Sequence, residues 1–132
     1  MILFRPVGLV ELRLIADSGF REFPPRLPGQ DIFYPVLDRA YAEQIARDWN
    51  TKDEASGYAG FVTELDLDDE FARAYPVQTA GSSSHRELWV PADELPSFNA
   101  NIRGPIRVVD AYTGPLFRGT IDPVSKLPTT RK

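Results

Sequence analysis

The residues best placed to do chemistry lie in the segment His85–Glu87, where a polar loop runs into an apolar stretch. The sequence contains this one histidine and no cysteine. One imidazole without thiolates cannot build a multi-histidine zinc centre, an iron–sulfur cluster or a thiol nucleophile. The chemistry open to this chain is therefore that of carboxylates, hydroxyls, arginines and aromatic rings, and no metal site is expected.

Glu87 opens the apolar stretch Glu87–Pro91. Charged side chains are seldom fully buried unless they are paired, so on spacing alone a strand edge beside a solvated loop is the favoured explanation. Common nucleotide and hydrolase motifs, namely the Walker loop, the dinucleotide glycine pattern and Gly-x-Ser-x-Gly, do not occur. The acidic run Asp66–Glu70 lacks the glycine and glutamate spacing of a calcium loop, and a capped helix explains it better.

Charge is uneven along the 132 residues, although 42% apolar and 26% charged residues are typical of a folded domain. Residues 1–30 carry a net charge of +1, residues 31–75 carry −7 and residues 76–132 carry +2, for −4 in all. A broad basic surface for nucleic acid is therefore not expected. Arg5, Glu11 and Arg13 interrupt the apolar start of the chain, so neither a signal peptide nor a membrane span is predicted, and a cytoplasmic location is expected.

The elements that must position these residues begin with a strand at Ile2–Arg5, which Pro6 is expected to end. Apolar residues at helical spacing predict a helix from Gly8 to Gly19, with the second glycine as a left-handed C-cap. The three prolines of Phe20–Gln30 predict a stiff loop.

A second strand is predicted over Asp31–Leu37, followed by Asp38 as the N-cap of a helix over Arg39–Trp49. Tyr41 and Trp49 recur at helical spacing in this helix, and the simplest interpretation is that both rings belong to the core. Strict alternation of apolar and polar residues predicts a strand at Phe61–Leu67, which follows a polar turn at Asn50–Gly57. After it we expect a helical turn capped by Asp68, a brief strand at Val77–Thr79 and a loop at Gly81–Ser84. The last predicted elements are a strand at Glu87–Val90, helical turns from Pro91 to Gly104 and a strand at Arg107–Tyr112.

This order of elements favours an α+β fold over a doubly wound sheet. A single domain is expected over residues 1–114. Beyond Gly114 the chain is rich in proline and threonine without any periodicity, so residues 115–132 are predicted to form a loose tail.

Glu87–Pro91, Glu-Leu-Trp-Val-Pro, resembles the Glu-aliphatic-aliphatic-aliphatic-Pro strand that carries the catalytic glutamate of ADP-ribosyltransferases. Leu3–Arg5 resembles their first strand, whose arginine or histidine contacts NAD. Ile32–Pro35 and the helix that carries Tyr41 resemble the strand and helix that wall the nicotinamide pocket. The resemblance implies a compact split β-sheet with two main helices and a short helical turn after Glu87–Pro91.

The stretch from Phe4 to Tyr112 is similar to small bacterial proteins labelled "ADP-ribosylation/crystallin J1", in four segments: Phe-Arg-Pro-Val-Gly, Phe-Pro-Pro-Arg-Leu-Pro, Ala-Arg-Asp-Trp-Asn-Thr-Lys-Asp and Glu-Leu-Trp-Val-Pro-Ala. The crystallin J1 relatives themselves are helical ADP-ribosyl hydrolases with paired metal-binding carboxylates. This chain is too short and too rich in strands for that helical fold.

The resemblance implies NAD as a substrate, with scission of the bond between nicotinamide and ribose. Glu87 would accept a hydrogen bond from the ribose and stabilise the developing positive charge. Arg5 would hold a phosphate or a ribose edge, Tyr34 would stack on nicotinamide and Tyr41 would line the pocket. His85 would orient the acceptor or act as its base. The acceptor itself, whether a protein, a nucleic acid or a small molecule, stays undetermined.

Two alternatives remain open. An arginine-type transferase would carry a Ser-Thr-Ser strand and a glutamate or glutamine two residues before the catalytic one, where this chain has His85, and its only serine run, Ser82–Ser84, lies in the preceding loop. The first alternative is therefore an inactive module that keeps the pocket for a nucleotide or a protein partner. The second is a small accessory or immunity-type protein acting through its acidic middle at Asp66, Asp68 and Asp69.

Overall fold

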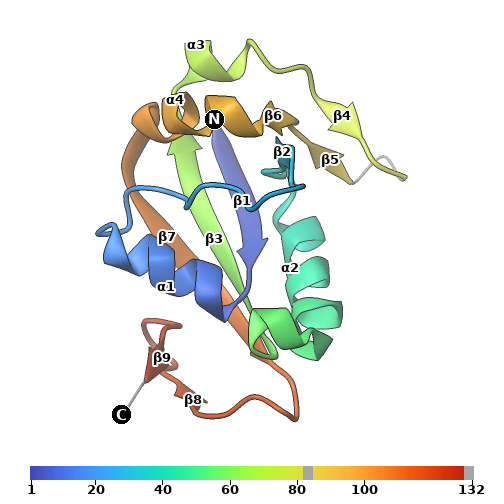
Figure 1. Cartoon of the computed structure of the whole chain (residues 1–132), viewed down its shortest axis with the longest axis vertical. Helices are drawn as coiled ribbons and strands as arrows, with labels where there is room; N and C mark the ends of the chain where they lie inside the picture. The colour runs from blue at the N-terminus through green and yellow to red at the C-terminus, as the bar shows by residue number, and fades with distance from the viewer. Residues whose placement is uncertain (82–84, 130–132) are drawn as a thin grey trace.

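The computed structural model describes residues 1–81 and 85–129 and shows the predicted α+β class. Its centre is a three-stranded antiparallel sheet in the order β1-β3-β7 (Figure 1). β1 spans Ile2–Val7, β3 spans Ala59–Leu67 and β7 spans Ile102–Thr113. β3 therefore lies in the middle of the sheet, and every residue from Ala59 to Thr63 is buried, because both faces of the strand are covered there.

The expectation that Pro6 ends the first strand is wrong, because β1 continues to Val7 with Pro6 opposite Val62. The N–H and C=O of Phe4 both bond to Val36, which lies on the side of β1 away from β3. Alternation along the strand places the nitrogen of Pro6 on that same outer side, where no ladder donor is needed.

Two helices pack on opposite faces of the sheet. α1 (Leu9–Asp17) contributes Leu12 and Ile15 to the main core. α2 (Arg39–Asp48) packs Ala42 and Ala46 on the other face in a smaller cluster. Both helices match their predictions, and Gly19 takes the expected left-handed conformation with φ 77°.

The backbone of Val36 joins the central sheet to the short strands around it. Val36 forms isolated antiparallel bridges with Phe4 of β1 and with Glu87 of β5 (Arg86–Glu87). Val36 therefore lies between Glu87 and β1. β5 also pairs with β4 (Gln78–Thr79), close to the strand predicted there.

The strands predicted over 31–37 and 87–90 are wrong in extent. Between these two segments, strand pairing in the described structure is limited to β2 (Ile32–Phe33) and β6 (Val90–Pro91), apart from the isolated bridge between Val36 and Glu87. The first predicted strand breaks because Pro35 has no amide donor and Val36 turns to a different partner. The second breaks at residues 88–89, which separate β5 from β6.

The remaining elements are short and mostly follow their patterns. The turn at 50–57 consists of η1 (Asn50–Lys52) and η2 (Glu54–Ser56), and Asp68 caps α3 (Asp69–Ala72) by accepting a hydrogen bond from the Phe71 amide. Pro91 lies at the end of β6 rather than inside a helix, and it precedes η3 (Ala92–Glu94) and α4 (Leu95–Ala100). Of the loop predicted at 81–84, residues 82–84 lie outside the described part.

Asp38 occupies the predicted N-cap position of α2, but its side chain makes no capping hydrogen bond. Its carboxylate instead accepts two hydrogen bonds from the Arg86 guanidinium, at 2.8 and 3.2 Å. These bonds hold the pKa of Asp38 below its ordinary value. The start of α2 is therefore tied directly to the strand that carries Glu87.

The loose tail predicted for 115–132 is wrong over its described part. β8 (Thr120–Ile121) and β9 (Pro128–Thr129) form a small hairpin, seen below the sheet in Figure 1. Phe117, Ile121 and Leu127 pack against the main core. These apolar side chains anchor a segment whose composition alone resembles a linker, and residues 130–132 lie outside the described part.

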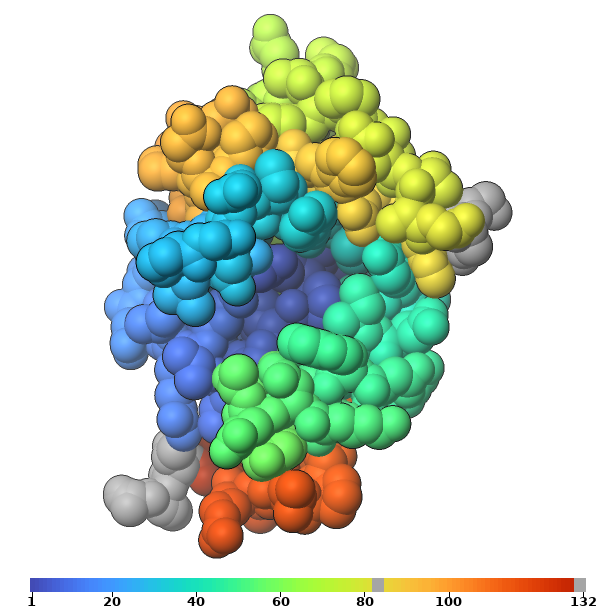
Figure 2. Space-filling model, turned by 45° about the vertical axis from the view of Figure 1, so that its right-hand side comes forward, coloured from blue at the N-terminus to red at the C-terminus, as the bar shows by residue number. Residues whose placement is uncertain are grey.

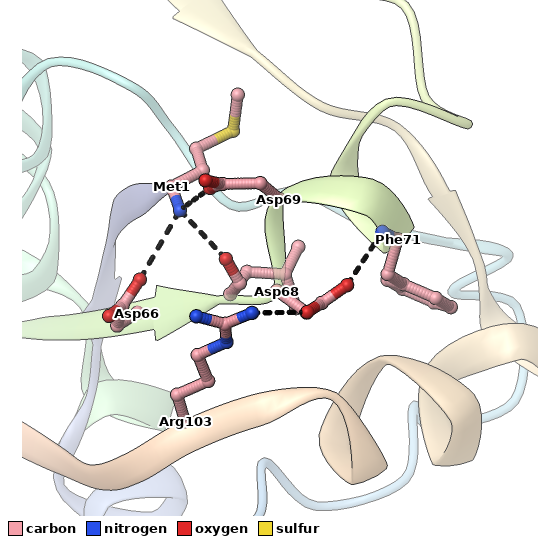
Figure 3. A network of polar contacts seen from close by, with 7 residues as sticks. Met1, Asp66, Asp68, Asp69, Phe71 and Arg103 are labelled. Atoms are coloured by element: carbon pink, nitrogen blue, oxygen red, sulfur yellow. Dashed lines mark hydrogen bonds and ion pairs between the residues drawn. The ribbon is translucent and has the colours of Figure 1, made fainter.

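The acidic run at the end of β3 is tied together by ion pairs (Figure 3). The Met1 ammonium pairs with Asp66 and Asp69 and donates to the Leu67 carbonyl, while Arg103 pairs with Asp68. These contacts fasten the start of β1 and the start of β7 to the end of β3. Among the described helices, none is long and apolar enough to span a membrane.

Candidate functional site

A cavity of about 470 Å³ opens where β1 separates from the segment 34–36. Beyond the bridge between Phe4 and Val36, β1 and the segment 34–36 move apart, and α2 forms the opposite wall of the cavity. Figure 2 shows the hollow from outside, with the start of the chain as its floor, the loop before β2 above it and α2 with the following turn beside and below it. Its lining residues come from five separate parts of the chain: Arg5, Pro6, Tyr34, Val36, Tyr41, Ile45, Trp49, Asn50, Ala80, Glu87 and Trp89.

Glu87 is 8% exposed, and two neutral donors form hydrogen bonds to its carboxylate. The Tyr41 hydroxyl donates to Oε1 at 3.1 Å, and the Trp89 indole N–H donates to Oε2 at 2.7 Å. Within the described residues, no cation lies within ion-pair distance of this carboxylate. Glu87 is therefore oriented and hydrogen-bonded, while its negative charge is not cancelled by a salt bridge.

Tyr41 links Glu87 to His85. Burial, together with the neighbouring Glu87 charge, raises the pKa of the Tyr41 hydroxyl, which keeps it a hydrogen-bond donor. The rings of Tyr41 and His85 stack at a centroid distance of 4.3 Å and an angle of 10°. His85 thus backs the tyrosine and is absent from the described cavity lining.

Arg5 is 9% exposed and points toward α1. Its Nε and Nη2 donate to the two carboxylate oxygens of Glu11 at 2.8 and 3.1 Å, and its guanidinium carbon lies 4.5 Å from the centre of the Phe33 ring. The two-pronged pair fixes the guanidinium plane. It also balances the charge of the arginine, so among the described lining residues Glu87 is the charged group without an ion-pair partner.

Three exposed aromatic side chains rim the cavity. Tyr34 and Trp89 meet edge to face at 6.4 Å on one wall, and Trp49 lies on the wall formed by α2. The interpretation of Trp49 as a core residue is wrong, since it is 59% exposed. Tyr41 also is not fully buried. The core face of α2 is made by Ala42 and Ala46, because Gly60 lets the helix approach β3 so closely that an added Cβ would lie 2.5 Å from the Ala46 carbonyl oxygen.

The structure brings four of the five predicted site residues to one cavity, namely Arg5, Tyr34, Tyr41 and Glu87, and places His85 behind it. Sequence reasoning missed Glu11 and the roles of Trp49 and Trp89. Alternation could have found Trp89, because residues two apart in an extended segment point to the same side, as Glu87 and Trp89 do. Glu11 is six residues after Arg5, and only the turn between β1 and α1 brings the two together.

Comparison with protein-family models, curated proteins and solved structures finds no significant match to this chain. The described residues contain no group of three or more metal-ligating side chains. The geometry of the cavity therefore carries the functional argument. It offers one oriented carboxylate, one paired arginine and a rim of flat rings.

Proposed function

We propose that this protein is an ADP-ribosyltransferase-like, NAD-binding enzyme that breaks the bond between nicotinamide and ribose. In this reaction nicotinamide leaves with the bonding electron pair, and an acceptor nucleophile or water attacks the ribosyl carbon and loses a proton. The products are ADP-ribosylated acceptor in one case and free ADP-ribose in the other.

The single observation that carries this proposal is the buried carboxylate of Glu87, which two neutral donors orient and which no cation of the described residues pairs. The nicotinamide ring of NAD is cationic, and positive charge moves to the ribose as the bond breaks. A unit charge pair about 4 Å apart near a protein surface is worth on the order of 4 kcal/mol. A carboxylate oriented in advance by Tyr41 and Trp89 would supply such stabilisation without reorganising.

The rest of the cavity suits the rest of the ligand. The exposed rings of Tyr34 and Trp89 offer flat surfaces for a nicotinamide ring, as the resemblance implies for Tyr34. Arg5 retains the N–H groups of Nη1, whose contact to the Tyr34 carbonyl is long at 3.5 Å, and these could turn to a phosphate or ribose oxygen.

The arrangement of the strands also supports the family proposal. The strand with Arg5 and the strand with Glu87 lie on either side of Val36, and the site opens where β1 separates from residues 34–36, as expected for a split sheet. The segment from Ile32 through α2 walls this opening, which is the role that the resemblance implies for it.

The test is release of nicotinamide from NAD, measured by chromatography with purified wild-type protein, Glu87→Gln and Glu70→Gln. Glu70 is an exposed glutamate of α3 and serves as the matched control. We expect release by the wild type and by Glu70→Gln, and a loss of at least about 100-fold in Glu87→Gln. Equal release by Glu87→Gln would remove Glu87 from the mechanism.

A second candidate, an inactive module that binds NAD or a related nucleotide, is favoured by the position of His85. Two residues before Glu87, an arginine-type transferase would present an acidic or amide side chain to its acceptor, whereas here the imidazole stacks on Tyr41. Saturable binding of NAD by calorimetry without release of nicotinamide would support this module. Turnover would exclude it.

A further inference from the structure

A second cavity, of about 430 Å³, lies on the other side of Arg5. The loop between α1 and β2, the outer side of α1 and the turn after α2 form its walls. It shares four residues with the cavity that contains Glu87: Arg5, Pro6, Trp49 and Asn50. One ligand could therefore extend from one cavity into the other.

Arg26 from the proline-rich loop lines this second cavity and is incompletely satisfied. Its Nε atom is buried and has no hydrogen-bond partner among the described residues. Burial, and then the charge of Arg5, lower the pKa of the Arg26 guanidinium. A charged N–H group removed from water without an acceptor costs folding free energy, so the Arg26 guanidinium would gain stability from an acceptor that a ligand brings to it.

Two guanidinium groups and one carboxylate meet beside Phe33, at the wall of the cavity that carries Arg26. Both guanidinium carbons lie near the Phe33 ring, that of Arg5 at 4.5 Å and that of Arg26 at 5.9 Å. Both carboxylate oxygens of Glu11 are engaged by Arg5. Asp53, the other acid of the lining, accepts a hydrogen bond from Ser56 in the turn after α2.

Hydrogen bonds fix the loop that carries Arg26 at Phe23 and close a turn after Arg26. The Asn99 side chain accepts a hydrogen bond from the Phe23 amide and donates one to the Phe23 carbonyl, both at 3.0 Å. The Leu27 amide donates to the side chain of Gln30. Three prolines further restrict the backbone, so the loop backbone that carries Arg26 would lose little conformational entropy on binding.

We propose that this second cavity is a phosphate-binding site, in which the Arg26 guanidinium and the N–H groups of Arg5 that Glu11 does not engage hold the phosphate oxygens of a phosphorylated ligand. A phosphate has enough acceptor oxygens to serve both guanidinium groups at once. Glu87 takes no part in this phosphate site, so the phosphate proposal does not depend on the cleavage of NAD. A phosphorylated ligand of any kind would be anchored here.

The test is binding of inorganic pyrophosphate, measured by calorimetry at constant ionic strength. We expect saturable binding by the wild type and by Arg73→Gln, an exposed arginine on the remote α3 side that serves as the matched control. Arg26→Gln should bind at least tenfold more weakly, with Arg26→Lys between them. Glu87→Gln should bind as the wild type does, which separates this site from the proposed cleavage.

An independent readout uses Trp49, which lines both cavities. The chain has two tryptophans, so Trp89→Phe leaves Trp49 as the sole indole fluorophore. Pyrophosphate should shift its emission in the Trp89→Phe protein with the same affinity as in calorimetry. An absence of saturable binding, equal binding by Arg26→Gln, or binding of acetate but not pyrophosphate would each overturn the proposal.

Discussion

Two acidic regions of this molecule hold their carboxylates in opposite ways. At the end of β3, Asp66, Asp68 and Asp69 are each paired with a cation and stand toward solvent. In the cavity, Glu87 is buried, held by two neutral donors, and has no described cation within ion-pair distance. Acids cancelled by cations fasten a fold, whereas an oriented acid with its charge uncancelled is available to a ligand.

This contrast bears on the hypothesis that the protein acts through its acidic middle. The carboxylates of Asp66, Asp68 and Asp69 are engaged by the Met1 ammonium and by Arg103, which join neighbouring strands (Figure 3). A partner would have to compete with these contacts, so the arrangement favours a structural role for the acidic run.

The largest expected effect is the difference in nicotinamide release between a substitution in the acidic run and one in the cavity. Asp68→Asn should keep the release of nicotinamide within about twofold of the wild type, because the Asp68 carboxylate binds Arg103 and the Phe71 amide and is not in the described lining of the cavity, whereas Glu87→Gln should lose at least about 100-fold. The measurement is the initial rate at saturating NAD. A larger loss in Asp68→Asn than in Glu87→Gln would reverse the assignment.

The next effect concerns the two donors to Glu87. Tyr41→Phe and Trp89→Phe each remove one hydrogen bond to a charged group, worth about 1.5–3 kcal/mol, so we expect kcat to fall by about 10-fold or more in each. Tyr75→Phe is a suitable control, since it removes a tyrosine hydroxyl that donates to Glu94 away from the cavity. If kcat is unchanged in both Tyr41→Phe and Trp89→Phe, orientation by these donors is not part of catalysis.

A smaller effect is expected from the arginine of the site. Glu11→Gln leaves the nearly buried Arg5 without its carboxylate partner, and about 1–3 kcal/mol of unfolding free energy should be lost. Urea denaturation of this variant against Glu22→Gln, an exposed glutamate, measures the difference. Equal stability of the two variants would show that the pair contributes nothing to the fold.

The smallest effect is a pH dependence in the acidic run. The hydrogen bond from Arg103, together with the Phe71 amide, holds the pKa of Asp68 below its ordinary 3.8. The resulting stability is present above pH 3.8 and is lost as the pH falls through the lower folded-state pKa. Asp68→Asn should therefore melt slightly below the wild type at neutral pH, with the gap closing in acid. A constant gap would contradict this account.

Sequence patterns predicted α1, α2 and the Asp68 cap because each depends on residues close together in the chain. They failed where a distant partner decides the outcome. Whether Pro6 ends β1 depends on which side Val36 occupies, and whether Trp49 is buried depends on Gly60, which sets how closely α2 approaches β3. The hairpin after Gly114 depends on apolar contacts with the main core.

The candidate site divides in the same way. The resemblance supplied Arg5, Tyr34, Tyr41 and Glu87, which line one cavity, but it could not supply Glu11, because no pattern in the sequence ties that side chain to Arg5. Arg26 was also missed. Its significance lies in a buried Nε atom without a described partner, which is a property of packing and not of sequence.

The central claim is that the cavity around Glu87 receives the nicotinamide ribose of NAD. A crystal structure of the Glu87→Gln protein soaked in NAD tests it most directly, because the substitution slows turnover while keeping the shape of the side chain. We predict nicotinamide against Tyr34 and the ribose within hydrogen-bond distance of residue 87. Density for NAD elsewhere on the molecule, with this cavity empty, would contradict the account.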